Sequence, residues 1–367
     1  AGETLYARMG SPVTGWANFE SAVDGGSLGY LVGLDLSREG LLLPGFPLRL
    51  LPPTFEHAEF EGAPVVWENL IVAAILERDN VGVRRGVAAF NRWTGDLVWY
   101  TGPLASGSVD GIERANYISH QLVSSAGGRL FYNTNLGHVV CLDPADGRVI
   151  WQTRYRRESL QGRTYPRPDR FRYRTVTPCL VSGGLVYCAP QDAPEVFALD
   201  ATNGALVWSS DAGGTEDAIH LVGIAGENLV CGGDHVVWLD RGSGRMIARF
   251  PGANTPGMVH ALPDPRGLGR GLVVGDQVYW PVAGEVLVLQ PDDPSPEVAP
   301  SSTGDDSQVQ LTVPKPVRIA ARYPLGSRGA EGGNLVPAGE YLIYASPRRI
   351  MAFERSPRDA RGAWPKF

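Results

Sequence analysis

Apolar and polar residues alternate along short stretches of this chain, and turns rich in Gly, Asn and Asp separate the stretches. Around Asp143, for example, Val139 and Cys141 precede the Asp at alternate positions, and Gly147 and Trp151 follow it. A period of two is typical of a β-strand that buries one face. The carboxylate of an Asp can accept backbone N–H groups of its own turn, and Gly adopts positive φ readily. The pattern therefore predicts two antiparallel strands joined by a tight turn.

This unit occurs three times with one spacing, a Gly four residues and a Trp eight residues after the Asp or Asn, and a fourth copy has Ala248 at the Trp position. A buried indole removes ~150–250 Å² of surface from water, so each Trp is expected to pack against the next copy of the unit. Weaker copies surround Asp35, Gln290 and Glu354. The residues of the repeat are Asn91, Gly95 and Trp99; Asp143, Gly147 and Trp151; Asp200, Gly204 and Trp208; and Asp240 with Gly244.

A second hairpin signal precedes the Asp strand in six of the units, at residues 65–72, 122–132, 179–188, 221–230, 272–279 and 335–343. Two hairpins per unit give four antiparallel strands. The chain is therefore predicted to be all-β, a β-propeller of four-stranded antiparallel blades. Seven blades are favoured, and six or eight also fit. The N-terminal segment 4–9 has strand character, and we expect it to close the ring as the outer strand of the last blade.

Two cysteines flank one of these hairpins. If Gly183 and Gly184 form its two-residue turn, Ser182 lies opposite Leu185 and the ladder brings Cys179 opposite Cys188. Directly opposite residues lie ~4.5–5.5 Å apart at Cα, within the range of a disulfide. The register allows either a disulfide or two buried thiols that face each other.

The Ala-x-Asp-x-x-x-Gly-x-x-x-Trp pattern resembles the tryptophan-docking repeat of the PQQ-like β-propellers, and the resemblance extends from about Gly62 to Glu354. That family includes quinoprotein dehydrogenases. It also includes non-enzymatic envelope proteins, such as the propeller lipoprotein of the outer-membrane β-barrel assembly machinery. The motif is structural, so the resemblance implies the fold and leaves the function open.

Two classes of function follow from the resemblance. The first is a non-catalytic extracytoplasmic scaffold that binds protein or ligand through its face loops. The second is an enzyme, a quinoprotein-type oxidoreductase or a hydrolase, with its site in the central channel. Quinoprotein dehydrogenases carry a pair of adjacent cysteines beside PQQ, whereas none of the four cysteines here is adjacent to another. Gly-x-Ser-x-Gly, His-Glu-x-x-His, P-loop and Cys-x-x-Cys motifs are also absent from the sequence. We therefore favour the scaffold and expect no cofactor, PQQ included, no catalytic residue and no metal site.

Polar residues recur where the first strand of a blade is expected to begin. We expect them to line the central channel, either as a polar funnel for a small ligand or ion or as side chains satisfied by one another and by water. These channel candidates are Glu61, His120, His220, Arg270, Glu331 and Asn334.

Composition adds limits on domain count and location. The chain has 367 residues, 43% of them hydrophobic and 20% charged, with a net charge of −6, and it has no run of 18 apolar residues. We expect one propeller domain over residues 1–367, with neither a transmembrane segment nor a nucleic-acid partner. No export signal opens the chain. We therefore expect a mature form, or an excised part of a longer protein, from the periplasm or cell envelope.

Two segments depart from the blade pattern. Residues 291–317 are rich in Pro, Ser and Asp, which predicts a mobile insertion. Residues 154–174 form an arginine-rich loop with a local charge of +6, which leaves −12 on the rest of the chain. Such a loop suits a protein or another anionic envelope partner, unless its arginines pair with carboxylates of their own chain. The candidate partner-binding residues are Arg154, Arg156, Arg157, Arg163, Arg167, Arg170, Arg172, Arg174, Tyr165 and Phe171.

Overall fold

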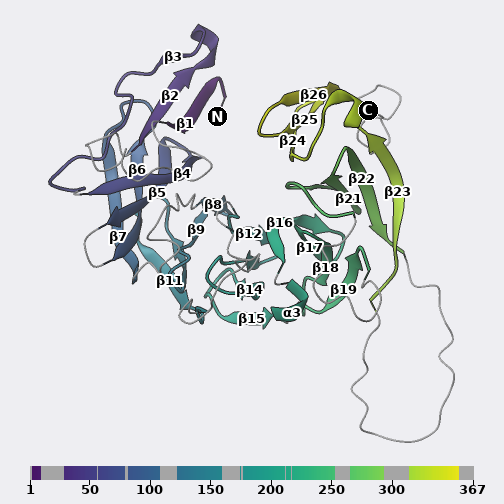
Figure 1. Ribbon diagram of the computed structural model, residues 1–367. Helices are drawn as coiled ribbons and strands as arrows, with labels where there is room; N and C mark the ends of the chain where they lie inside the picture. Colours follow the sequence, from purple (N-terminus) through teal and green to yellow (C-terminus); the bar gives the residue numbers. More distant parts are fainter. Residues whose placement is uncertain are drawn as a thin grey trace, which may run out of the picture. The chain divides into compact units, whose positions relative to one another are not determined.

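The protein is an all-β, seven-bladed β-propeller of antiparallel sheets, described by a computed structural model (Figure 1). Five sheets have four strands, and the first and last have three within the described part of the chain. The chain divides into two compact units, Ala1–Val207 and Trp208–Phe367. The structure describes residues 2–9, 29–55, 57–78, 82–107, 122–158, 174, 177–210, 212–215, 217–252, 265–292 and 314–354.

The first unit holds blades 1 to 3 and most of blade 4. Blade 1 consists of β1 (Thr4–Met9), β2 (Tyr30–Asp35) and β3 (Leu41–Leu42), with a 3-10 turn at Leu36–Arg38. Blade 2 consists of β4 (Ala58–Trp67), β5 (Leu70–Arg78), β6 (Val83–Asn91) and β7 (Leu97–Gly107). Blade 3 consists of β8 (Val123–Ala126), β9 (Arg129–Asn133), β10 (His138–Leu142) and β11 (Val149–Arg154). Blade 4 consists of β12 (Leu180–Ser182), β13 (Leu185–Cys188), β14 (Phe197–Asp200) and β15 (Leu206–Ser209), which crosses the boundary between the units.

The second unit holds blades 5 to 7, preceded by the four-residue helix α3 (Ala212–Thr215). Blade 5 consists of β16 (Ala218–Ala225), β17 (Asn228–Gly233), β18 (Val236–Asp240) and β19 (Met246–Phe250). Blade 6 consists of β20 (Leu272–Val274), β21 (Gln277–Val282), β22 (Glu285–Pro291) and β23 (Val317–Pro324). Blade 7 consists of β24 (Asn334–Ala338), β25 (Tyr341–Ala345) and β26 (Ile350–Glu354), after a 3-10 turn at Gly326–Arg328.

The predicted turn joins the third and fourth strands of blades 2 to 5, as Asn-x-x-x-Gly in blade 2 and Asp-x-x-x-Gly in the other three. In blade 3, Asp143 Oδ1 accepts the N–H of Ala145 at 3.0 Å, and Gly147 donates its N–H to the Asp143 carbonyl at 2.9 Å. Gly147 has φ +72°, where a glycine meets no Cβ strain. The ladder slips by one residue immediately afterwards, from Cys141↔Trp151 to Leu142↔Val149. Blades 2 and 5 slip at the same place, so the turn and the bulge form one repeated structural unit.

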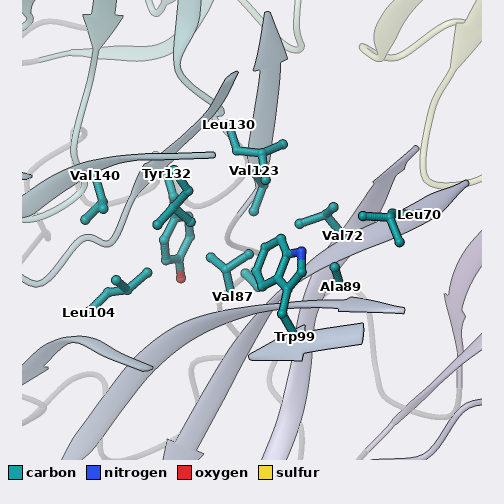
Figure 2. Packing of buried hydrophobic residues seen from close by; sticks show 12 residues of the cluster. Leu70, Val72, Val87, Ala89, Trp99, Leu104, Val123, Leu130, Tyr132 and Val140 are labelled. Atoms are coloured by element: carbon teal, nitrogen blue, oxygen red, sulfur yellow. The ribbon is translucent and has the colours of Figure 1, made fainter. Parts of the chain in front are cut away.

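The hydrophobic core lies between neighbouring sheets. Side chains of blades 2 and 3 form one such layer, in which the indole of Trp99 lies among Val87, Ala89 and Val123 (Figure 2). Period-two alternation supplies these side chains, because each strand turns every second residue towards the neighbouring blade. A single sheet cannot bury its own apolar face, so each blade is stabilised by the next.

The predicted role of the N-terminal strand is wrong. Instead of completing the last blade, β1 pairs with β2 along its whole length, from Thr4↔Asp35 to Met9↔Tyr30. This partner satisfies the backbone groups of β1 and lets Tyr6 pack with Leu31 in the core between blades 1 and 2. The described part of blade 7 consists of β24, β25 and β26 alone.

Candidate functional site

The three repeat tryptophans have structural roles and are not available to a ligand. Each is only 7–8% exposed, which confirms the prediction that they are buried. Each indole N–H donates to a backbone carbonyl in the turn of the following repeat: Trp99 to Pro144 at 3.1 Å, Trp151 to Ala201 at 3.1 Å, and Trp208 to Arg241 at 2.8 Å. A partner therefore cannot bind through these indoles.

A pocket of about 640 Å³ opens in the first unit at the start of the arginine-rich loop. The end of β7, the β9–β10 turn and the end of β11 form its walls. Strand pairing explains this arrangement, because His138 lies opposite Arg154 in the ladder and the Tyr155 N–H donates to the Gly137 carbonyl at 2.9 Å. The lining residues are Ser106, Leu136, Gly137, His138, Arg154, Tyr155, Arg156 and Arg157.

One buried carboxylate holds this wall in place. Asp192, which is 4% exposed, lies between β13 and β14 of the next blade. It accepts the Tyr155 hydroxyl at 2.6 Å, the Gly137 N–H at 3.1 Å and Arg157 Nε at 2.8 Å. Burial, followed by the charge and the hydrogen bond of Asp192, raises the pKa of Tyr155 well above its usual value. Tyr155 therefore stays a neutral donor, and blade 4 fixes the positions of Tyr155 and Arg157.

The two remaining pocket arginines lack such a carboxylate. Arg154 and Arg156 are both exposed, and neither side chain makes an ion pair or hydrogen bond to another described residue. Side chains alternate between the two sides of an extended strand, so Arg154 and Arg156 point to one side. Tyr155 and Arg157 point to the other side, towards Asp192. Guanidinium groups bind carboxylate or phosphate through two parallel hydrogen bonds. The pocket can therefore accept an anionic group.

Arg174 differs from these arginines, and its predicted place at a partner surface is wrong. Its side chain is 0% exposed and donates to four backbone carbonyls at 3.0–3.2 Å, those of Pro190, Ala193, Pro194 and Glu195. It thus stabilises the connection that carries Asp192. The other predicted loop residues, Arg163, Arg167, Arg170, Arg172, Tyr165 and Phe171, lie outside the described residues.

Three of the channel candidates occupy one register position on the first strands of their blades. Glu61, His220 and Asn334 pair with Ala74, Gly232 and Ala345. On the third strands, these partners pair with Val87, Val236 and Ile350. Each of these three residues lies four positions before the Asp, Asn or equivalent residue that begins the repeat turn. Arg270 lies just ahead of β20, and the Leu335 N–H donates to its carbonyl at 2.9 Å. The repeat therefore brings these candidates to equivalent places in different blades.

The channel candidates differ in their exposure and in the residues that they contact. In the first unit, Glu61 is 1% exposed and forms a buried ion pair with Arg85, whose Nε lies 3.0 Å from Oε2. In the second unit, the exposed Glu331 lies 3.5 Å from Arg348. His120 lies outside the described residues. His220, Arg270 and Asn334 remain as one polar group of the second unit.

Backbone and side-chain contacts connect this group. The Arg270 N–H donates to Asn334 Oδ1 at 2.8 Å, and the Arg270 guanidinium donates to the Leu221 carbonyl at 3.2 Å. The Nδ1 atom of His220 is buried and has no hydrogen-bond partner among the described residues. Burial and the nearby charge of Arg270 lower the pKa of His220 to about 4, so its ring is neutral at pH 7.

A second polar cluster of this unit has no counterpart in the sequence predictions. Asp217 Oδ2 lies 2.6 Å from His235 Nδ1, and Arg249 approaches the same ring nitrogen at 2.9 Å. Burial alone would raise the pKa of Asp217, but the hydrogen bond and charge of His235 and the charge of Arg249 lower it overall. Only the pairing of β16 to β19 brings the three residues together, and their spacing in the sequence gives no signal.

The cysteine hairpin has the predicted register, with Leu180↔Tyr187, Val181↔Val186 and Ser182↔Leu185. Cys179 and Cys188 are buried free thiols with their sulfurs 3.7 Å apart, the second of the two predicted outcomes. Burial, followed by the hydrogen bond and charge of Cys179, raises the pKa of Cys188 well above its usual value.

In the described part of the chain, no helix is both long and apolar enough to cross a membrane. No group of three or more His, Cys, Asp or Glu side chains is placed there to hold a metal ion.

Comparisons with known proteins add a family and a fold. The family model described as outer membrane protein assembly factor BamB matches residues 83–290. No curated protein sequence matches the chain. Among solved structures, BamB from Moraxella catarrhalis is similar, with a TM-score of 0.52 and 14% identity over 88% of this chain and 78% of that one. This similarity supports the fold alone.

Two further solved structures are more distant. The computationally designed protein Ika8 has a TM-score of 0.47 and 12% identity over 89% of this chain and 80% of that chain. A quinohemoprotein alcohol dehydrogenase from Pseudomonas putida has a TM-score of 0.39 and 15% identity over 63% of this chain and 38% of that chain. Neither similarity is close enough to carry a functional argument.

Proposed function

This chain belongs to the family described as outer membrane protein assembly factor BamB, and from this premise we propose that it is an assembly scaffold of the cell envelope. In this proposal it acts outside the cytoplasm, performs no chemistry and holds a protein partner of the outer-membrane assembly machinery. The partner binds at the blade face that carries the pocket of Arg154, Arg156 and Arg157.

The observation that carries this proposal is a pair of arginines that have no carboxylate partner among the described residues and lie on a rigid support. Arg154 and Arg156 are exposed in the pocket, while Asp192 fixes the neighbouring Tyr155 and Arg157. A preorganised basic surface loses little side-chain entropy when it binds, which favours affinity for an acidic segment. Because surface charges are screened by ions, we expect this binding to weaken as salt rises.

The alternative is an enzyme whose site lies among the channel candidates. Glu61 is committed to a buried ion pair with Arg85, and His220 is a neutral base beside a cation. These observations do not favour acid–base or redox chemistry, so we retain the enzyme only as an outcome of the test. Activity with an alcohol and an electron acceptor after addition of PQQ and Ca²⁺ would establish it.

The test is complementation in the source organism. Deletion of the gene should lower the amount of folded outer-membrane β-barrel protein, measured by heat-modifiable mobility of those proteins in gels. Wild-type protein should restore the amount, and an Arg154→Gln/Arg156→Gln variant should not. Arg148→Gln is the matched control, because Arg148 is an exposed arginine at the opposite end of the same blade. Full restoration by the double variant would remove the pocket from the proposal, and a deletion without effect would remove the scaffold function.

A further inference from the structure

The group formed by His220, Arg270 and Asn334 in the second unit has hydrogen-bond donors but no carboxylate. Arg270 is partly buried, and desolvation lowers its pKa. It forms no ion pair with a carboxylate of the described residues. Glu331, which lies just ahead of β24, is exposed and lies beside Arg348. A buried cation without a counterion is unfavourable in a protein interior.

The neighbouring His220 also has an unsatisfied polar atom. Nδ1 of His220 is buried without a partner, although buried polar atoms are normally hydrogen-bonded. Arg270 is held close to this ring, because its guanidinium donates to the carbonyl of Leu221, the next residue. A neutral imidazole can present an N–H at Nδ1. A cation and an unused donor therefore lie side by side.

Asn334 supplies a third donor at the exposed edge of the group. Its Oδ1 accepts the Arg270 N–H at 2.8 Å, which fixes the orientation of the amide and leaves the Nδ2 hydrogens for another acceptor. Asn334 itself is exposed, so this side of the group is open to solvent. An incoming group can approach Asn334 and the partly buried Arg270 from there.

From these three donors we infer that His220, Arg270 and Asn334 form a binding site for a small oxyanion, a carboxylate or a phosphate. The ligand would supply an acceptor for His220 Nδ1 and for the remaining N–H groups of Arg270 and Asn334, and its charge would offset that of Arg270. This site is separate from the pocket of the first unit and does not depend on the proposed scaffold function.

The experiment uses purified full-length protein and inorganic phosphate. Imidazole signals of the six histidines are followed by long-range ¹H–¹⁵N correlation spectra near pH 6, with chloride replaced by phosphate at constant ionic strength. A His220→Asn variant assigns the signal of His220. We expect phosphate to shift this signal in a saturable manner, and to raise the pKa of His220 from about 4, because a bound anion stabilises the protonated ring. A parallel titration with acetate shows whether a carboxylate binds more tightly than a phosphate.

Two variants decide the result. Arg270→Gln should weaken phosphate binding by roughly tenfold or more, the loss expected for a charge-assisted hydrogen bond. Arg266→Gln should leave it unchanged, because Arg266 is an exposed arginine four residues earlier on the same connection. If Arg270→Gln fails to fold, weaker phosphate binding by His220→Asn, measured calorimetrically, takes its place. The inference is overturned if neither anion shifts the His220 signal saturably, or if the Arg270 or His220 variant binds as tightly as the wild type.

Discussion

Replacing Gly147 with alanine tests whether docking of Trp99 on the next turn holds the blades together. Gly147 lies at φ +72°, and a Cβ atom added to it would be 2.7 Å from Trp99 Cδ2 and 2.6 Å from Thr101 Oγ1. The turn can shift little to relieve this overlap, since the Thr101 hydroxyl donates to the Gly147 carbonyl at 2.8 Å. The substitution therefore introduces both backbone strain and overpacking.

The two effects can be separated with a matched glycine. Gly128 has φ +71°, and a Cβ atom added there meets nothing within 4 Å, so Gly128→Ala measures the backbone strain alone. A left-handed conformation costs a non-glycine residue about 1–2 kcal/mol, and overpacking adds about 1–3 kcal/mol. We expect Gly147→Ala to lower the free energy of unfolding by about 2–5 kcal/mol, against about 1–2 kcal/mol for Gly128→Ala.

The assay is urea unfolding followed by circular dichroism, extended to a double-mutant cycle. Trp99→Ala alone should cost about 3–5 kcal/mol. In that background Gly147→Ala should cost less than it does in the wild type, because the ring it would overlap has gone and only the contact with Thr101 Oγ1 remains. Equal losses for the two glycine variants, or no coupling between Trp99 and Gly147, would refute the docking account.

Three further predictions concern groups outside the repeat. His235 and Arg249 lower the folded-state pKa of Asp217, so the stability that this carboxylate contributes is present at neutral pH and is lost as pH falls through that lowered pKa. Asp217→Asn should therefore lower the urea midpoint at pH 7, and its difference from the wild type should shrink as the pH is lowered below about 4. Refolding with oxidised glutathione should join Cys179 to Cys188, because their sulfurs lie 3.7 Å apart. Each new disulfide releases two reduced glutathione molecules. Non-reducing peptide mapping that finds both thiols free would contradict this prediction. Arg174→Met should lower the free energy of unfolding in urea by about 2–4 kcal/mol, because several buried carbonyls lose their donor. A loss below about 0.5 kcal/mol, as expected for a surface substitution, would contradict this stabilising role.

Local chemistry made much of the fold predictable from the sequence. The turn at Asp143 and Gly147 and the hairpin between Cys179 and Cys188 depend on residues close together in the chain, and both have the predicted form. The pairing of β1 was not predictable in this way, because strand character alone does not determine which sheet edge a terminal strand joins.

The candidate sites depended more strongly on long-range contacts. Arg154 and Arg174 belong to one arginine-rich segment, yet one is exposed in a pocket and the other is buried against backbone carbonyls. What distinguishes them is the connection that carries Asp192, contributed by the next blade. Composition identified the segment, and only tertiary contacts identified which of its arginines can bind a partner.

Site-specific photocrosslinking in intact cells tests the scaffold proposal most directly. A photoreactive amino acid replaces Arg156 in the pocket or, as a control, Arg148 at the opposite end of blade 3, and both positions are exposed. The account predicts an adduct from position 156 that contains a subunit of the outer-membrane protein assembly machinery, weakened by Asp192→Ala and absent from position 148. No adduct at position 156, or the same adduct from both positions, would contradict it.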